Sequence, residues 1–103
     1  MSDKLSNTNR VTPEHVNRLF HTLEYRYERV GDTTTTGCWA FLPLPGGKEF
    51  QVGYGESACV DPANYIKSTG EHYARERCET AAKDKIWELE GYALATTGKV
   101  SEI

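Results

Sequence analysis

The sequence lacks any apolar run close to the roughly 20 residues that a membrane-spanning helix requires. Residues 1–10 also lack the apolar segment of a secretory signal peptide, because Leu5 stands alone in a polar stretch after Met1. We therefore expect a protein that neither inserts into a membrane nor is secreted, and that acts in the cytoplasm.

Basic residues are fewer than acidic residues. Lys and Arg together number 12 against 15 for Asp and Glu, which gives a formal net charge of -3. A protein that holds nucleic acid by neutralising phosphates needs clustered basic residues, so nucleic-acid binding is not expected. A weaker alternative is that nucleic acid binds to a local patch formed by Lys67, Arg75, Lys83 and Lys85. Binding to a basic protein surface or to a small molecule stays open.

Cysteine is scarce, and its spacing matches no common framework. Cys38, Cys59 and Cys78 are odd in number and too widely spaced for a disulfide framework or a zinc site. We expect buried thiols in a reducing compartment. His72 lies beside an acidic residue but lacks the His-Glu-x-x-His arrangement of a metal site. No metal and no cofactor are therefore predicted.

The composition is that of one small globular domain. The chain has 103 residues, of which 38% are hydrophobic and 11% aromatic, and this suffices for one core but not for two. Polar stretches at both ends predict flexible tails over residues 1–10 and 96–103. The single domain is therefore expected over residues 11–95.

A short amphipathic helix is predicted at the start of this domain. Thr12 can cap it and Pro13 suits its first turn, while Val11 can pack against Val16. Apolar residues then recur at helical spacing as far as Leu23. This pattern predicts about three helical turns.

Three strands arranged as a meander are predicted next. Residues 24–30 alternate with a period of two. Residues 38–42 follow a threonine-rich segment and are apolar on both faces, which suits a central strand. A turn rich in Pro and Gly separates them from residues 48–54, which alternate again. The third strand is expected to place Phe50, Val52 and Tyr54 on one face and Glu49, Gln51 and Gly53 on the other.

A long helix is predicted from Pro62 onward. Asp61 repeats the capping arrangement of the first helix, and Val60 is placed to pack against Tyr65. Gly70 weakens a helix by about 1 kcal/mol, so either close packing compensates or the helix bends there. The inward stripe is expected to consist of Ile66, Gly70, Tyr73, Ala74, Cys78, Ala81, Ile86, Leu89 and Ala93.

The segment Gly55-Glu56-Ser57-Ala58-Cys59 has two interpretations. A Ser or Cys on a strand-to-helix turn can be a nucleophile activated by a neighbouring base. Hydrolases have glycine where Cys59 stands, however, and none of the three His residues lies in a motif, so no catalytic residue is predicted. In the structural interpretation Gly55 permits an unusual backbone angle, Ser57 satisfies local backbone groups and Cys59 fills the core.

Aromatic residues are more numerous than one face of a small sheet needs. If the helices cover one face, some aromatic side chains must line the other, where they would bind a partner protein, a second copy or bases. The acidic net charge counts against bases, whereas the edges of a small sheet favour a homodimer. The candidate binding residues are Trp39, Phe41, Tyr54, Glu56, Ser57, Cys59 and Trp87.

Three segments of the chain occur together in the same order. They are Val-Thr-Pro-Glu at residues 11–14, the run from Gly-Glu-Ser-Ala-Cys to Asn-Tyr at 55–65, and Asp-Lys-Ile-Trp-Glu-Leu-Glu-Gly-Tyr-Ala-Leu at 84–94. With these segments the chain resembles a small tailed-phage protein family, named for gene products forty-nine and sixty-six of two podophages. The resemblance covers roughly residues 11–95. Glu88 stands where the family commonly has proline, and Ala93 where a larger aliphatic residue is usual. The resemblance implies a phage origin and expression in the bacterial cytoplasm, and it brings no established catalytic activity.

These patterns predict an α+β fold with a short N-terminal helix, a three-stranded antiparallel meander and a long C-terminal helix packed across the sheet. The predicted function is that of a small non-catalytic phage accessory protein, which binds a host protein, such as a defence protein, stoichiometrically. The alternative is an enzyme, or a protein that sequesters a small molecule or nucleotide, with a pocket around Glu56, Ser57 and Cys59.

Overall fold

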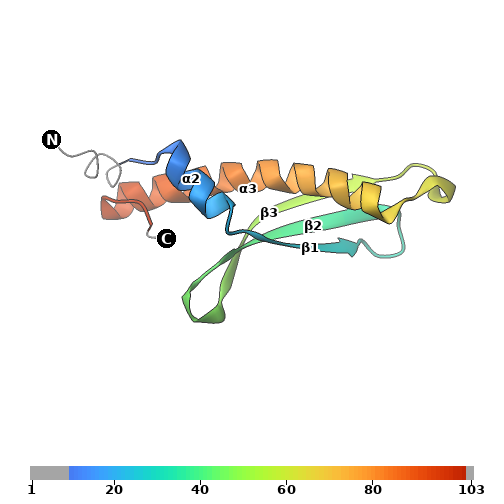
Figure 1. Ribbon diagram of the computed structural model, residues 1–103, viewed down its shortest axis with the longest axis horizontal. Coiled ribbons are helices and arrows are strands. Elements are labelled where there is room, and N and C mark those ends of the chain that lie inside the picture. Colours follow the sequence, from blue (N-terminus) through green and yellow to red (C-terminus); the bar gives the residue numbers. More distant parts are fainter. Residues whose placement is uncertain (1–9, 102–103) are drawn as a thin grey trace.

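A long helix lies along one face of a three-stranded sheet (Figure 1). The computed structural model describes residues 10–101. In chain order, the helices and strands are α2 (Pro13–Phe20), β1 (Glu24–Arg29), β2 (Thr35–Pro43), β3 (Glu49–Ala58) and α3 (Lys67–Thr97). Short 3-10 helices precede and follow β3, at Pro45–Gly47 and Pro62–Asn64. The predicted α+β architecture is confirmed.

Helix α2 begins at the predicted cap. Thr12 Oγ1 accepts a hydrogen bond from the backbone N–H of His15 at 3.2 Å, and Pro13 occupies the first turn. The helix ends at Phe20, so it is shorter than the three turns expected. Leu23 lies beyond this end but still belongs to the buried core.

The strands pair antiparallel in chain order, with β2 at the centre of the sheet. This arrangement confirms the meander and the central position predicted for residues 38–42. Strand β3 extends beyond the predicted end at Tyr54, because residues 55–58 continue the ladder with β2. Ser57 therefore lies within a strand and not on a strand-to-helix turn, the geometry that the nucleophile interpretation needs.

A bulge in the β2–β3 ladder changes which side chains share a face. The register shifts between Ala40 and Phe41, which leaves Val52 as an extra residue on β3. Val52 is 3% exposed and its neighbour Gly53 also faces α3, so Tyr54 lies on the opposite face, against Trp39. The prediction that Val52 and Tyr54 share a face is wrong, because a strict period of two does not anticipate the extra residue.

The connection from β3 to α3 also differs from the prediction. Pro62–Asn64 form a 3-10 turn, with Asp61 as its side-chain cap. The backbone is extended at Tyr65, and α3 begins only at Lys67, not at Pro62. Val60 is 100% exposed, so its expected packing against Tyr65 is absent. The Asp-Pro pair initiates a turn here, but the turn does not propagate into the helix.

The buried residues of α3 recur every four positions. They are Ala74, Cys78, Ala82, Ile86 and Glu90. Ala82 is buried where Ala81 was expected, whereas Ile66 and Tyr73, which were expected to face inward, are 60% and 48% exposed. Because an α-helix has 3.6 residues per turn, a spacing of four makes the stripe wind slowly around the helix. Its first members face the sheet, and its last member faces α2.

Glycines on β3 let α3 approach the backbone of the sheet. A Cβ atom on Gly55 would lie 2.3 Å from the backbone N of Cys78 and 2.5 Å from the carbonyl O of Ala74. One on Gly53 would lie 2.9 Å from the Cβ of Ala82. Gly55 is not among the glycines with positive φ, so the unusual backbone angle predicted for it is wrong. Its contribution is the absence of a side chain at the closest helix–sheet contact.

The same reason accounts for Gly70, where the sequence left two explanations open. Helix α3 passes through Gly70 without a break. A Cβ atom there would lie 2.6 Å from Thr36 Oγ1, on the inner face of β2. Close packing, and not a bend, is therefore the explanation.

Helix α3 ends at Thr97, where Gly98 takes a left-handed conformation and its N–H donates to the carbonyl of Leu94 at 2.8 Å. The chain then turns back, so that Ser101 reaches Glu90 on the same helix. Residues 1–9 and 102–103 of the predicted tails lie outside the described residues. Among the helices of residues 10–101, none is long and apolar enough to cross a bilayer.

Candidate functional site

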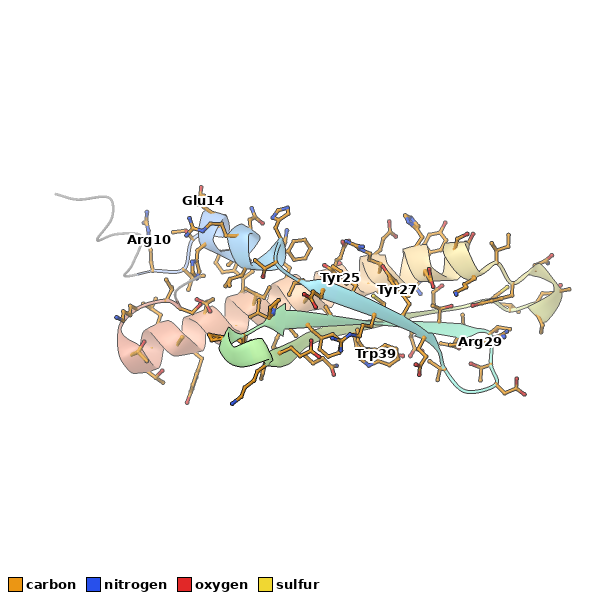
Figure 2. The ribbon with its side chains drawn as sticks, turned by 60° about the horizontal axis from the view of Figure 1, so that its bottom comes forward. Arg10, Glu14, Tyr25, Tyr27, Arg29 and Trp39 are labelled. Carbon is orange, nitrogen blue, oxygen red and sulfur yellow. The ribbon has the colours of Figure 1, made fainter. Side chains whose placement is uncertain are left out.

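The face of the sheet opposite α3 carries an aromatic pair at its centre. Trp39 of β2 and Tyr54 of β3 are partners across the ladder, with ring centroids 4.8 Å apart and planes inclined at 53°. The Trp39 ring also lies over Gly37, where a Cβ atom would meet its Cη2 at 2.6 Å. Both rings are half-buried. Figure 2 shows Trp39 on the side of the sheet away from α3, whereas Tyr25 and Tyr27 lie between β1 and α3.

A second aromatic residue on this face, Phe41, is covered by a cation from β1. The guanidinium carbon of Arg26 lies 4.2 Å from the centre of the Phe41 ring. The same guanidinium donates from Nη2 to Glu49 Oε2 at 2.7 Å. This hydrogen bond lowers the pKa of Glu49 below its usual value. A cation stacked on a ring and held by a carboxylate from another strand is thus part of this face.

The charges around the aromatic residues are mostly negative. Among the outward-facing residues of β1, β2 and β3, Arg26 alone is positively charged, and Glu occupies the other charged positions. These carboxylates belong to Glu24 and Glu28 of β1 and to Glu49 and Glu56 of β3. Tyr54 Oη donates to Glu56 Oε1 at 2.9 Å. Burial, followed by the neighbouring Glu56, raises the pKa of Tyr54.

A shallow cleft of about 320 Å³ opens on this face beside Trp39. Residues from all three strands line it, namely Arg26, Tyr27, Glu28, Trp39, Phe41 and Gln51. The cleft therefore combines aromatic surface, a carboxylate, a guanidinium and an amide, and it can hold a side chain from another molecule. We call this surface, built around Trp39, Phe41 and Tyr54, the outer aromatic face.

The other candidate residues do not form one site. Ser57 and Cys59 line a cavity of about 210 Å³ at the start of α3, together with Tyr65 and Gly70. Glu56 is absent from that cavity, because its side chain binds Tyr54 on the outer aromatic face. The convergence of Glu56, Ser57 and Cys59 predicted for the alternative function is therefore wrong.

The three thiols lie in two different environments. Cys38 and Cys78 are fully buried between the sheet and α3, and burial raises the pKa of Cys78 to about 12. Cys59 is partly exposed, and its Sγ donates to the carbonyl of Asp61 at 3.1 Å. The expectation that Cys59 fills the core is wrong, because the chain has already left the sheet at this residue.

The basic residues of α3 mostly have partners within the molecule. Arg75 stacks on Tyr25 at 4.1 Å and donates to Glu79 at 3.0 Å, and Lys83 lies 4.7 Å from the centre of the Phe20 ring. Burial raises the pKa of the Tyr25 hydroxyl to about 12. Arg75 and Lys83 therefore connect α3 to β1 and to α2 through contacts with aromatic rings.

Trp87 is 38% exposed on α3, and so lies on the other side of the sheet from Trp39. It is not part of the outer aromatic face. Within residues 10–101, no group of three or more His, Cys, Asp and Glu side chains is placed to hold a metal ion.

The sequence interpretation missed a buried polar cluster at the end of α3. His15 Nε2 donates to Glu90 Oε1 at 2.7 Å, and Ser101 donates to the same carboxylate through its N–H at 2.8 Å and its hydroxyl at 2.7 Å. Burial raises the pKa of Glu90, but these hydrogen bonds outweigh burial and leave the pKa below its usual value. The signal in the sequence was Glu90 itself, four residues after Ile86 at an inward position.

A family model matches most of the chain. Residues 11–97 match the model of a family described as phage protein (N4 Gp49/phage Sf6 gene 66). The match spans both helices and the whole sheet. No curated protein gives a significant match.

Proposed function

The chain belongs to the phage protein (N4 Gp49/phage Sf6 gene 66) family, and from this premise we propose that it is a non-catalytic accessory protein that binds a host protein in the bacterial cytoplasm. The proposed complex is stoichiometric, and the outer aromatic face forms its interface on the phage protein. The observation that carries the proposal is the presence of Trp39, Phe41 and Tyr54 on a sheet face that neither α2 nor α3 covers.

The composition of this face supports a protein partner. Interfaces are enriched in Trp, Tyr, Phe and Arg at the centre and have a polar rim. Here Trp39, Tyr54, Phe41 and Arg26 lie at the centre, with Gln51 and the carboxylates around them. An aromatic pair already packed together loses little conformational entropy when it binds.

A homodimer is a separate proposal. A free strand edge suits a dimer interface better than the outer aromatic face does. Two copies meeting through that face would bring like charges together, because each presents four Glu residues and one Arg. At the edge of β3, Arg77 Nη1 already donates to the carbonyl of Glu56 at 2.7 Å, so β1 offers the freer edge. The molar mass in solution, measured by light scattering, tests this proposal.

The alternative of an enzyme or a small-molecule carrier has less support. Of the three residues assigned to it, only Ser57 and Cys59 share a cavity, and no His residue lines it. Labelling of Cys59 by a thiol reagent, compared with the unfolded chain, tests whether this thiol is activated. A rate no higher than that of the unfolded chain removes the remaining support for the alternative.

The main proposal is tested by affinity capture from a lysate of the bacterium that the phage infects. Wild-type protein and Trp39→Ala are used as bait, and captured proteins are identified by mass spectrometry. We expect a host protein that wild type retains and that Trp39→Ala loses. When both components are purified and mixed, they should form a complex of defined stoichiometry in light scattering.

The matched control is Tyr92→Ala. Tyr92 is an aromatic residue of α3 that is 70% exposed, so its removal changes a large side chain away from the outer aromatic face. Tyr92→Ala should capture the same host protein as wild type. Capture that survives Trp39→Ala, or no specific capture by wild type, would contradict the proposal.

A further inference from the structure

Within residues 10–101, cations cover four of the aromatic rings. Arg26 lies 4.2 Å from the centre of Phe41, and Arg75 lies 4.1 Å from that of Tyr25. The other two pairs are Arg29 with Tyr65 at 4.6 Å and Lys83 with Phe20 at 4.7 Å. Trp attracts a cation more strongly than Phe or Tyr does. Among residues 10–101, however, no cation lies over Trp39.

The surroundings of Trp39 nevertheless suit a cation. Glu28 of β1 and Glu56 of β3 both pair with Gly37, one from each side, and the Trp39 ring lies over this glycine. Neighbouring strands are about 4.8 Å apart, so the backbones of the two Glu residues are separated by about 10 Å. A cation on Trp39 would therefore have a carboxylate on either side.

Neither carboxylate is neutralised within the described part of the chain. The ion pairs of residues 10–101 do not include Glu28 or Glu56, and the only side-chain partner of Glu56 is the hydroxyl of Tyr54. Glu28 also lines the 320 Å³ cleft beside Trp39, which leaves room for an aliphatic stem.

We propose that Trp39, Glu28 and Glu56 bind an arginine side chain from a basic segment of the partner protein. The guanidinium stacks on the indole ring and pairs with the two carboxylates, while the rest of the segment lies along the cleft. This inference rests on the proposed function and specifies the chemistry of the partner.

The protein contains an intramolecular example of the proposed contact. On the same face as Trp39, Arg26 stacks on Phe41, which lies two residues further along β2, and donates to Glu49 at 2.7 Å. A planar guanidinium can stack on a ring and pair with carboxylates at its edge, whereas the ammonium of lysine is a compact, strongly hydrated charge. Arginine is therefore the preferred ligand.

Charge also separates this partner from the other candidates. A second copy would bring its own four carboxylates and one guanidinium against the same four carboxylates and guanidinium of this face. Nucleic acid would bring phosphates. Both meet repulsion at Glu28 and Glu56. A basic protein segment meets attraction at both.

The probe is a synthetic peptide of alternating arginine and alanine, titrated into ¹⁵N-labelled full-length protein and followed by NMR. The protein has two Trp residues, and each indole N–H gives its own signal. We expect the Trp39 signal to shift with saturation and the Trp87 signal to stay in place, because Trp87 lies on α3. The same peptide with citrulline in place of arginine keeps the shape but removes the charge, and it should not bind.

Two variants test the assigned residues. Glu28→Gln/Glu56→Gln keeps the fold, because both side chains are exposed, and should weaken peptide binding by about tenfold. Trp39→Ala should weaken it by about as much. The control Asp84→Asn/Glu88→Gln removes the same charge from exposed positions of α3 and should change the affinity less than twofold.

The outcomes separate this inference from the proposed function. If citrulline and arginine peptides bind equally, or the paired Gln variants bind as wild type does, the arginine site is wrong. A host protein captured through Trp39 would then still support the proposed function. Peptide binding without any host capture would support the site and contradict the proposed function. Binding of a DNA oligonucleotide, or dimerisation lost in Trp39→Ala, would overturn the assignment of the partner.

Discussion

The two faces of the sheet differ in the size of the side chains that β2 and β3 place on them. On β2, Cys38 and Ala40 face α3 and are fully buried, whereas Trp39 and Phe41 alternate with them on the outer aromatic face. On β3 the inner face has glycine, and the outer face has Tyr54. On β2 and β3, small side chains and glycines thus line the side that packs against α3, and Trp39, Phe41 and Tyr54 line the side that α3 leaves uncovered.

This difference separates the origin of stability from the proposed site of binding. Helix α3 approaches the sheet so closely that backbone atoms limit the distance, and a side chain as small as methyl does not fit at Gly55. The outer rings contact mainly each other, Gly37 and Arg26. We therefore expect small changes on the inner face to unfold the protein, and larger changes on the outer face to be tolerated.

The largest effect is expected for Gly55→Ala. The added methyl group would lie 2.3 Å from the N of Cys78 and 2.5 Å from the O of Ala74, which are backbone atoms that cannot rotate away. We expect the free energy of unfolding to fall by about 3 kcal/mol or more. Urea denaturation followed by circular dichroism measures this change.

Gly91→Ala is the matched control for that substitution. Gly91 lies inside α3, and a Cβ atom there has no neighbour within 4 Å. The same change should therefore raise the free energy of unfolding by about 1 kcal/mol, the helix propensity of Ala over Gly. Equal effects at the two positions would show that α3 is not held at backbone distance from the sheet.

A smaller loss is expected for Glu90→Gln, at the end of the inner stripe. The carboxylate accepts hydrogen bonds from His15 and Ser101, so replacing it should cost about 2 kcal/mol at pH 7. Asp84→Asn, which alters an exposed acidic residue on the same helix, should stay close to wild type.

The effect of Glu90 should also depend on pH. Its pKa is lower in the folded protein than in the unfolded chain, so the folded state binds fewer protons. The stability from Glu90 is complete above the ordinary pKa of about 4.3 and is lost as the pH falls through the folded value. The difference in the free energy of unfolding between wild type and Glu90→Gln should shrink in urea denaturation as the pH falls through the lowered pKa of Glu90. A constant difference down to acidic pH would rule out this linkage.

The smallest loss of stability is expected for Trp39→Ala, although it removes the largest side chain. The Trp39 ring is half-buried and its main partner is Tyr54, so we expect a loss of about 1 kcal/mol. The variant should keep the circular dichroism spectrum of wild type while it loses partner binding. A loss as large as that of Gly55→Ala would show that the outer aromatic face is part of the folding core.

Much of the architecture follows from local patterns in the sequence. The cap at Thr12 and Pro13 and the central place of residues 38–42 depend on neighbouring residues, and they were predicted correctly. The wrong predictions concern side chains whose orientation depends on contacts between residues far apart in the chain. The bulge at Val52 moves Tyr54 to the outer face, and the twist of the stripe selects Ala82 over Ala81.

The structure brings only some of the candidate binding residues together on one face. Trp39, Phe41 and Tyr54 were chosen because the sheet has more aromatic residues than one face can bury, and they do lie together. Glu56 was grouped with Ser57 and Cys59 because they are adjacent in the chain, but the strand alternation turns Glu56 to the other face.

The sequence by itself determined the order of helix, strands and helix, because capping residues and apolar periodicity act over a few positions. Only the tertiary structure decided which face of the sheet is covered. That choice depends on how closely α3 can approach Gly53 and Gly55, a contact between residues far apart in the chain. The free face, and with it the Glu28, Trp39 and Glu56 cluster, follows from that contact.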